Sequence, residues 1–199
     1  NTVLSDDGLH LYAEIDGHVS VKDGKVHILP VYEVPGDVDY STGNIEFVGD
    51  VVVKGTVREG FEVTAGGNII VNGVVEGATL SCEGTITLKR GIRGMSKGKI
   101  QASGNIVSTY FGQAWVRSEA DIFVSEAIMH CDIGARGTID AMQGGKGLIV
   151  GGKIQAGRGV RCETLGNDMG TKTEIIVGLP PKLKERYDNM VKNREEIEG

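Results

Sequence analysis

Apolar β-forming residues recur at an unbroken spacing of six near the start of this chain. The run is Ile45, Val51, Val57, Val63, Ile69 and Val75. The same spacing continues, with slips of a few residues, through Leu80, Ile86, Ile92, Ile100, Ile106, Val116, Ile122, Ile128, Ile133, Ile139, Ile149, Ile154 and Val160. A spacing of six fits neither the 3.6-residue period of a helix nor a plain two-residue alternation. Short strands separated by tight bends produce it when each points one side chain at a common axis, so the sequence predicts a β-solenoid.

A second, longer repeat indicates the length of one turn of this coil. Its units are Gly49-Asp50-Val51, Gly67-Asn68-Ile69, Gly84-Thr85-Ile86, Gly104-Asn105-Ile106, Ala120-Asp121-Ile122 and Gly137-Thr138-Ile139, which begin 18, 17, 20, 16 and 17 residues apart. Three short strands and their corners fill one such interval, which predicts about seven turns. The small residue suits a corner where φ is positive or the backbone is crowded. We expect the neighbouring Asp and Asn side chains to bond their own backbone in turns.

Composition excludes several classes of function. The net charge of −6 gives no electrostatic basis for binding nucleic acid, and no run of 18 apolar residues is present for membrane insertion. The three cysteines, Cys82, Cys131 and Cys162, cannot all pair and form no CxxC motif. With no visible signal peptide, this cysteine usage predicts a reduced, cytoplasmic setting. The start at Asn1 rather than Met suggests a piece of a longer protein.

The two ends of the chain do not follow the six-residue spacing. Residues 1–36 contain alternating apolar runs separated by Asp-Gly pairs, which predicts a small antiparallel β unit capping the solenoid of residues 37–178. Ile175-Ile176-Val177 is expected to be the last strand. Residues 179–199 begin with Pro180-Pro181 and continue with strong helix formers. They include a partial coiled-coil seam at Leu183, Tyr187, Met190, Arg194 and Ile197, in which Arg194 is out of place. This segment is predicted either to begin a coiled coil or to form a helix packed on the solenoid flank.

Two short segments resemble the bacterial flagellar assembly protein A family. The first is Pro35-Gly36-Asp37-Val38-Asp39-Tyr40-Ser41-Thr42-Gly43-Asn44-Ile45, which is similar to the opening motif of that family. The second, Gly170-Thr171-Lys172-Thr173 with Ile176-Val177-Gly178, is similar to its closing segment. The resemblance covers about residues 1–199 and implies a right-handed parallel β-helix, related to bactofilins, followed by a coiled coil. It also implies flagellar assembly and carries over no catalytic residue.

The leading functional prediction is therefore a non-enzymatic cytoplasmic scaffold that acts through protein–protein interaction in flagellar assembly or a related cell-surface process. Self-association is an open possibility, and no cofactor, metal or small-molecule substrate is expected. The alternative is a left-handed hexapeptide-repeat acyltransferase that uses acyl-coenzyme A, because a spacing of six is typical of that class too. His130 would be its catalytic candidate. A carbohydrate-active β-helix is a third reading, for which clustered carboxylates and aromatic surface are lacking.

Three motifs contain residue types that are found in metal sites or phosphate-binding loops. His130-Cys131 with Cys162 suggests a metal site, but an offset of about two turns places the two cysteines roughly 10 Å apart, too far to share one ion. Gly144-Gly145-Lys146-Gly147 and Gly151-Gly152-Lys153 resemble phosphate loops, but both lead into predicted strands rather than helices. Solenoid corners explain these glycines better.

The candidate partner-binding residues are Tyr110, Phe111, Trp115, Arg90 and Arg93. Aromatic residues are otherwise scarce in the repeats, and a bulge or loop is expected near Ser108–Trp115. A strand through Tyr110 and Phe111 would point one ring inward and the other outward. The nearby basic residues, Lys89, Arg90, Arg93, Lys97 and Lys99, suggest either a solvated loop or a site for an acidic protein partner.

Overall fold

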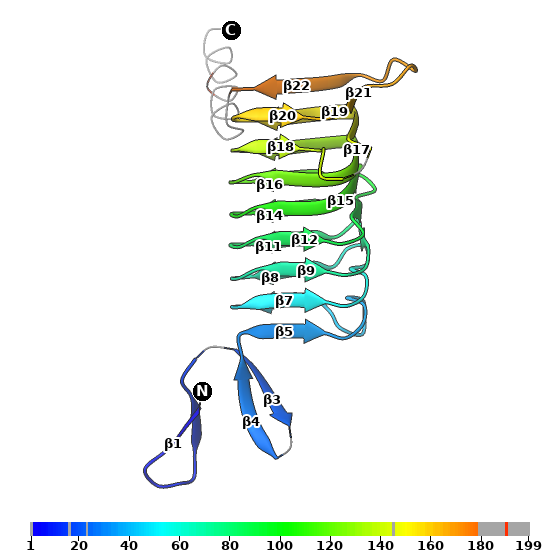
Figure 1. Cartoon of the computed structure of the whole chain (residues 1–199). Helices are drawn as coiled ribbons and strands as arrows, with labels where there is room; N and C mark the ends of the chain where they lie inside the picture. Colours follow the sequence, from blue (N-terminus) through cyan, green and yellow to red (C-terminus); the bar gives the residue numbers. More distant parts are fainter. Residues whose placement is uncertain (1, 16, 23, 145, 179–189, 191–199) are drawn as a thin grey trace.

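The computed structural model describes residues 2–15, 17–22, 24–144, 146–178 and 190. Within these residues the chain forms a parallel β-solenoid preceded by two antiparallel hairpins (Figure 1). All the strand pairs described in the large sheet are parallel, and each strand pairs with the strand one turn before or after it. The predicted β-solenoid is confirmed.

The two hairpins lie at the N-terminal end. Strand β1 (Thr2–Leu4) pairs with β2 (Leu11–Ala13), and β3 (His18–Lys22) pairs with β4 (Lys25–Leu29), both antiparallel. Gly8 and Gly24 adopt positive φ between the paired strands, as the Asp-Gly signals predict. Asp16 and Asp23 lie outside the described residues.

Strands of the solenoid form three faces. The first face contains β5 (Val31–Val34), β7 (Asp50–Val53), β9 (Ile69–Val71), β12 (Ile86–Leu88), the start of β15 (Ile106–Gly112), the start of β17 (Ile122–Ala135), β18 (Thr138–Asp140) and β20 (Gly159–Arg161). The second face contains bridges at Val38 and Val57, then β10 (Val75–Glu76), β13 (Ile92–Arg93), the end of β15, the middle of β17, the start of β19 (Leu148–Ala156) and β21 (Thr164–Leu165). The third face contains β6 (Ile45–Phe47), β8 (Glu62–Ala65), β11 (Thr79–Cys82), β14 (Lys99–Ala102), β16 (Trp115–Ser118), the ends of β17 and β19, and β22 (Thr173–Val177).

Each of the three faces has one strand or bridge per turn, and this gives about eight turns in the described part of the chain rather than the predicted seven. We number these turns as levels 1 to 8 from β5 to β22. The extra turn arises because β5 pairs in parallel with β7. The solenoid therefore begins at Val31, before the predicted boundary at residue 37, since Tyr32 and Val34 turn inward beside Val51 and Val53.

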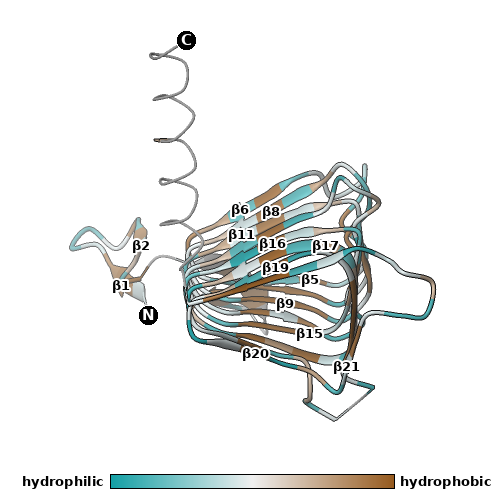
Figure 2. Ribbon diagram, turned by 90° about the horizontal axis from the view of Figure 1, so that it is seen from above, coloured by the Kyte–Doolittle hydropathy of each residue, from teal (hydrophilic) through white to brown (hydrophobic). Residues whose placement is uncertain are grey.

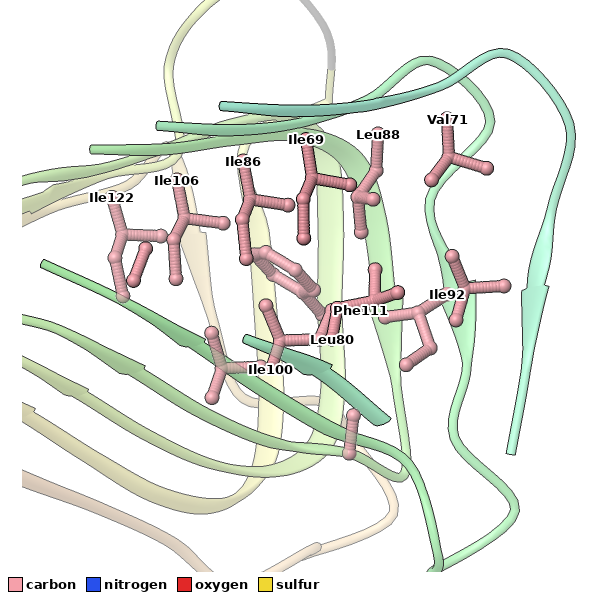
Figure 3. Close-up of a cluster of buried hydrophobic side chains, with 14 of the residues drawn as sticks. Ile69, Val71, Leu80, Ile86, Leu88, Ile92, Ile100, Ile106, Phe111 and Ile122 are labelled. Atoms are coloured by element: carbon pink, nitrogen blue, oxygen red, sulfur yellow. The ribbon is translucent and has the colours of Figure 1, made fainter. Parts of the chain in front are cut away.

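The core is a stack of the residues that share the six-residue spacing. All of them are buried except Val160, which is half-buried. Figure 3 shows Ile69, Ile86, Ile106 and Ile122 from the first face in one row, opposite Leu80 and Ile100 from the third face. Matching side chains repeat at each level because parallel strands stack about 4.8 Å apart. The spacing thus predicts the core correctly.

The triplet repeats form the corner between the third and first faces. The Asp50 Oδ1 atom accepts a hydrogen bond from the backbone N–H of Asn68, at 2.6 Å. Asn68 Oδ1 in turn accepts one from Thr85 N–H, at 2.8 Å, and Asp121 Oδ1 accepts one from Thr138 N–H, at 2.6 Å. These side chains therefore bond the backbone of the turn above, whereas the sequence predicted hydrogen bonds to their own backbone.

The glycines before Asp50 and Asn68 are required by crowding rather than by positive φ, whereas Asp121 is preceded by Ala120. A Cβ atom built at Gly67 would overlap Asp50 Oδ1 and the backbone of Gly49. Gly67 itself does not have positive φ. The hydrogen-bonded Asp50 carboxylate and the backbone of the turn below thus occupy the volume that a side chain at position 67 would need.

The C-terminal strand is confirmed as β22, which pairs with β19. The predicted helix or coiled coil of residues 179–199 lies outside the described residues, apart from Met190. In the part of the chain that the structure describes, no helix is long and apolar enough to cross a bilayer.

We predict that Gly67→Ala lowers the free energy of unfolding by about 1–3 kcal/mol, because the added methyl group displaces the Asp50 carboxylate or the backbone below it. Gly159→Ala is the matched control, since no heavy atom lies within 4 Å of the added Cβ there. Urea denaturation of both variants measures the difference. Equal stability of the two variants would contradict the crowded corner.

Candidate interaction surface

The five residues predicted to bind a partner do not form one surface. Phe111 is fully buried and fills the second-face position at level 5, between Ile92 and Ile128. It cannot anchor a partner, and its selection as a surface residue was wrong. The six-residue spacing slips between Ile106 and Val116 because Phe111 supplies the missing core residue. The prediction that Tyr110 and Phe111 point to opposite sides is confirmed.

Tyr110 and Arg93 come close together on the second face. The Tyr110 ring lies over Gly112, which is in register with Arg93. Burial raises the pKa of the Tyr110 hydroxyl, the nearby Cys131 raises it further, and Arg93 acts in the opposite direction. These two residues offer a small half-buried surface with one exposed cation.

The basic residues of this region do not gather into a cluster. Arg90 is exposed at a corner after β12, whereas Lys99 lies on the third face. Lys97 forms an ion pair with Glu59 at 2.7 Å. The extra residues of the long repeat form the turn Gly94–Gly98, where Met95 and Ser96 have positive φ. The bulge or loop expected near Ser108–Trp115 is found as a shift in strand register between Ser108 and Tyr110 in β15.

Trp115 lies on the third face, away from Tyr110, and belongs to a small ordered group. The Arg117 guanidinium lies 4.5 Å from the centroid of the Trp115 ring. Arg117 also donates to the Asp132 carboxylate and to the Asp132 carbonyl, each at 3.0 Å. Gly134 is in register with Arg117 and leaves room for its side chain, which is only 19% exposed. The cation and the ring are thus held in place before any partner arrives.

A shallow depression of about 490 Å³ adjoins Trp115 on the third face. Small hydroxyl residues at level 3 form its floor, and longer side chains surround it; it is lined by Glu62, Thr79, Leu80, Ser81, Lys99, Gln101 and Trp115. Trp115 is half-buried, and an aromatic ring beside a fixed arginine is a common anchor in protein interfaces. Of the predicted residues, Trp115 therefore has the best surroundings for binding a partner.

The outer surface of the first face carries a feature that the sequence reasoning missed. Its outward positions form one column in register, which we call the first-face column: Glu33, Val52, Ile70, Thr87, Val107, Phe123, Asp140 and Arg161. The middle of this column is apolar except for Thr87, and Val107 is 39% exposed. The corresponding outward column on the third face is mainly polar; it contains Glu46, Thr64, Ser81, Gln101 and Arg117.

A signal for this column is present in the sequence. Three strands of the first face carry three consecutive bulky apolar residues: Val51-Val52-Val53, Ile69-Ile70-Val71 and Ile122-Phe123-Val124. Strands of the third face alternate, as in Leu80-Ser81-Cys82. Figure 2 shows the contrast, with brown strands on the β5, β9 and β20 side and more teal on the β8 and β16 side.

The cysteines are placed as core residues rather than as reactive groups. Cys82 and Cys131 are buried, and all three cysteines are free thiols. Burial raises the pKa of both the Cys82 and the Cys131 thiols to about 11. Cys131 Sγ accepts from Ala114 N–H at 3.5 Å and donates to the Met129 carbonyl at 3.2 Å.

His130 is exposed beside Cys131 and has a φ of 53°, where β17 turns between the second and third faces. Its ring lies over Gly151. Among the residues that the structure describes, no three His, Cys, Asp or Glu side chains gather in a geometry that would hold a metal ion.

Comparison with known proteins identifies the family. Residues 30–199 match the family model of the Flagellar Assembly Protein A beta solenoid domain. The chain belongs to this family. Its match begins at Pro30, next to the observed first solenoid strand at Val31. No curated protein and no solved structure matches the chain.

The different positions of Phe111 and Tyr110 yield a direct test. Phe111→Ala is expected to lower the free energy of unfolding by about 3–5 kcal/mol, because it opens a cavity in the core. Tyr110→Ala is expected to cost roughly 1 kcal/mol, since its ring is half-buried. Chemical denaturation compares the two, and a larger loss for Tyr110→Ala would show that the assignment of inside and outside is reversed.

Thiol labelling tests the burial of the cysteines. At pH 8 a thiol with a pKa near 11 is about 0.1% ionised, so Cys82 and Cys131 are expected to react slowly with a thiol reagent. Cys162 is only partly buried and is expected to react first. Mass spectrometry of peptides after timed labelling gives the order, with urea-unfolded protein as the control. Fast labelling of Cys131 in the folded protein would contradict the packed core.

Proposed function

We propose that the chain is a non-enzymatic scaffold in flagellar assembly and that it acts by binding protein partners. The family match supports the process. The observation that carries the scaffold role is the uninterrupted apolar core from level 1 to level 8. Such a core gives a stiff rod about 34 Å long, with outer faces that can hold partners at fixed separations.

The surroundings of the candidate chemical groups support a non-enzymatic role. The Cys131 thiol is kept protonated by burial, and the acyltransferase candidate His130 is exposed beside Gly151. The depressions on the third face are shallow and lie outside the core. A partner surface centred on Trp115, with Arg117 held beneath it, fits these features better than a site for turnover.

We also propose that the coil is right-handed. In Figure 1 strands β5 and β7 run left to right on the near side, with the C-terminal turns uppermost. In Figure 2, viewed from above, β6 and β8 lie on the far side, so the chain winds anticlockwise as it rises towards the viewer. This sense of winding supports a right-handed coil over the left-handed hexapeptide type.

The N-terminal hairpins are proposed to shield the first turn, in a cytoplasmic protein with reduced cysteines. Gly17 and Val19 line one depression together with Tyr32 and Phe47. The Tyr32 and Phe47 rings pack at 5.8 Å between centroids and lie against the core. The position of Gly17 and Val19 beside this depression supports a cap on the exposed strand edge at level 1.

The test is replacement of the chromosomal gene by a Trp115→Ala variant. We expect fewer flagellar filaments per cell by electron microscopy, and loss of flagellar proteins from the material cross-linked to the chain. The matched control is Val48→Ala, which removes an exposed apolar side chain from a bend outside the Trp115 group. Unchanged filaments in the Trp115 variant would overturn the Trp115 surface, and unchanged filaments after gene deletion would overturn the proposed process.

A further inference from the structure

We propose that the first face of the solenoid binds a second copy of this chain, with the two solenoid axes antiparallel. The juxtaposition that carries the inference is the first-face column: apolar side chains in its middle, an anionic residue at one end and a cationic residue at the other. This surface is separate from the Trp115 group on the third face, so the inference does not depend on the proposed function.

The first argument is the sequence of the first-face strands. A sheet covered on one side alternates apolar and polar residues, whereas strands covered on both sides become continuous apolar runs. Levels 2 and 3 have Val51-Val52-Val53 and Ile69-Ile70-Val71, and level 6 has Ile122-Phe123-Val124. In each run the first and last residues are buried and the middle one points outward. These strands of the first face thus have the residue pattern of a sheet with a second layer. Within the described residues, Asp140 at level 7 is covered by the segment Met142–Gln143, whereas Val107 at level 5 is 39% exposed.

The second argument is the match in spacing. The outward side chains of the first-face column repeat every level, about 4.8 Å apart, and do so in a straight row. A second copy presents the same row with the same spacing. Side chains of one copy can therefore fit between those of the other along the whole face, as in two packed sheets.

The third argument is charge, which selects the relative direction of the two copies. Glu33 lies at level 1 and Arg161 at level 8 of the first-face column. Antiparallel axes place Glu33 of each copy against Arg161 of the other, at both ends of the interface. Parallel axes would place like charges together at each end, which is unfavourable.

The intrachain contacts of these two residues leave them able to pair across the interface. Glu33 contacts Lys54 at 3.4 Å and Arg161 contacts Asp140 at 3.5 Å. The Glu33 side chain is 63% exposed and the Arg161 side chain is 65% exposed. The Glu33–Lys54 pair lies at the surface and contributes little stability, so Glu33 can change its partner at small cost. The Asp140 side chain is only 9% exposed, so Arg161 is expected to keep this contact and to meet Glu33 of the other copy through its remaining guanidinium N–H groups.

In the antiparallel arrangement level 2 of one copy faces level 7 of the other, level 3 faces level 6, and level 4 faces level 5, and none of these pairs places like charges together. Ile70 of one copy faces Phe123 of the other, and Thr87 faces Val107. Level 7 carries Asp140, whose carboxylate accepts from Met142 N–H at 2.9 Å and from Gln143 Nε2 at 3.1 Å. Those contacts hold the segment Met142–Gln143 beside the column, where it meets Val52 of the other copy.

The size of the face sets the strength of the contact. Eight levels by three to four residues give a flat footprint of roughly 400 Å² per copy, before side-chain relief is added. This is at the low end for specific interfaces, so the dimer is expected to be reversible, with a dissociation constant in the micromolar range.

Sedimentation velocity of the chain over a series of about 1 to 200 μM, a range that brackets this expected dissociation constant, tests the proposal. We expect a concentration-dependent shift from monomer to dimer. Val107→Glu is expected to weaken the dimer at least about tenfold, since it buries a charge against an apolar row. Val48→Glu is the matched control, because Val48 is 64% exposed and lies outside the first-face column. A monomer throughout the series, or equal effects of both variants, would overturn the proposal.

A charge exchange tests the antiparallel direction. Glu33→Arg alone and Arg161→Glu alone are each expected to weaken the dimer several-fold. The double variant restores the attraction between copies, although both intrachain pairs remain broken, so its dissociation constant is expected to return towards that of the starting protein. Additive weakening in the double variant would exclude this pairing, and with it the antiparallel arrangement. Circular dichroism melts confirm that every variant is folded.

Discussion

The structure depends on one constraint, which is that each turn must place its apolar side chains directly above those of the turn below. Backbone hydrogen bonds between parallel strands fix the vertical spacing, and the buried Val, Ile and Leu rows fix the rotation from one turn to the next. At the corners, Asp50, Asn68 and Asp121 extend the same ladder through their side chains. A slip of one residue at any level would expose its core residues.

This constraint leaves the outward positions free to differ between faces. The third face carries hydroxyl, amide and charged side chains around Trp115, whereas the first face has an apolar column. The same backbone repeat thus presents two unlike surfaces. The proposed self-association and the proposed partner site would use different faces of one solenoid, because the outward side chains of the two faces belong to separate columns.

The core was predictable from the sequence because every turn must bury its inward side chains, and nineteen apolar residues therefore follow the same spacing. The surface was less predictable for a physical reason. Phe111 was predicted as a candidate surface residue because it is aromatic and falls outside the six-residue spacing. It nevertheless fills a core position, and this becomes visible only from its pairing with Ile92 and Ile128. The grouping of Trp115, Arg117 and Asp132 depends on strand register between levels 5 and 6, which local sequence does not define. The first-face column has a sequence signal in the apolar triplets at levels 2, 3 and 6. The six-residue spacing identifies only the inward positions and therefore does not predict this column.

The central claim is a uniform rise from turn to turn, and distances between paired spin labels measure it most directly. The outward third-face positions Glu46, Thr64 and Ser81 lie at levels 1, 2 and 3, and Ile176 lies at level 8. With Cys162 replaced by serine, each of the three is labelled together with Ile176 as a cysteine pair. Stacked turns predict separations of about 34, 29 and 24 Å, falling by one strand spacing at each step. Distances that do not decrease in equal steps would contradict a chain wound around a single axis.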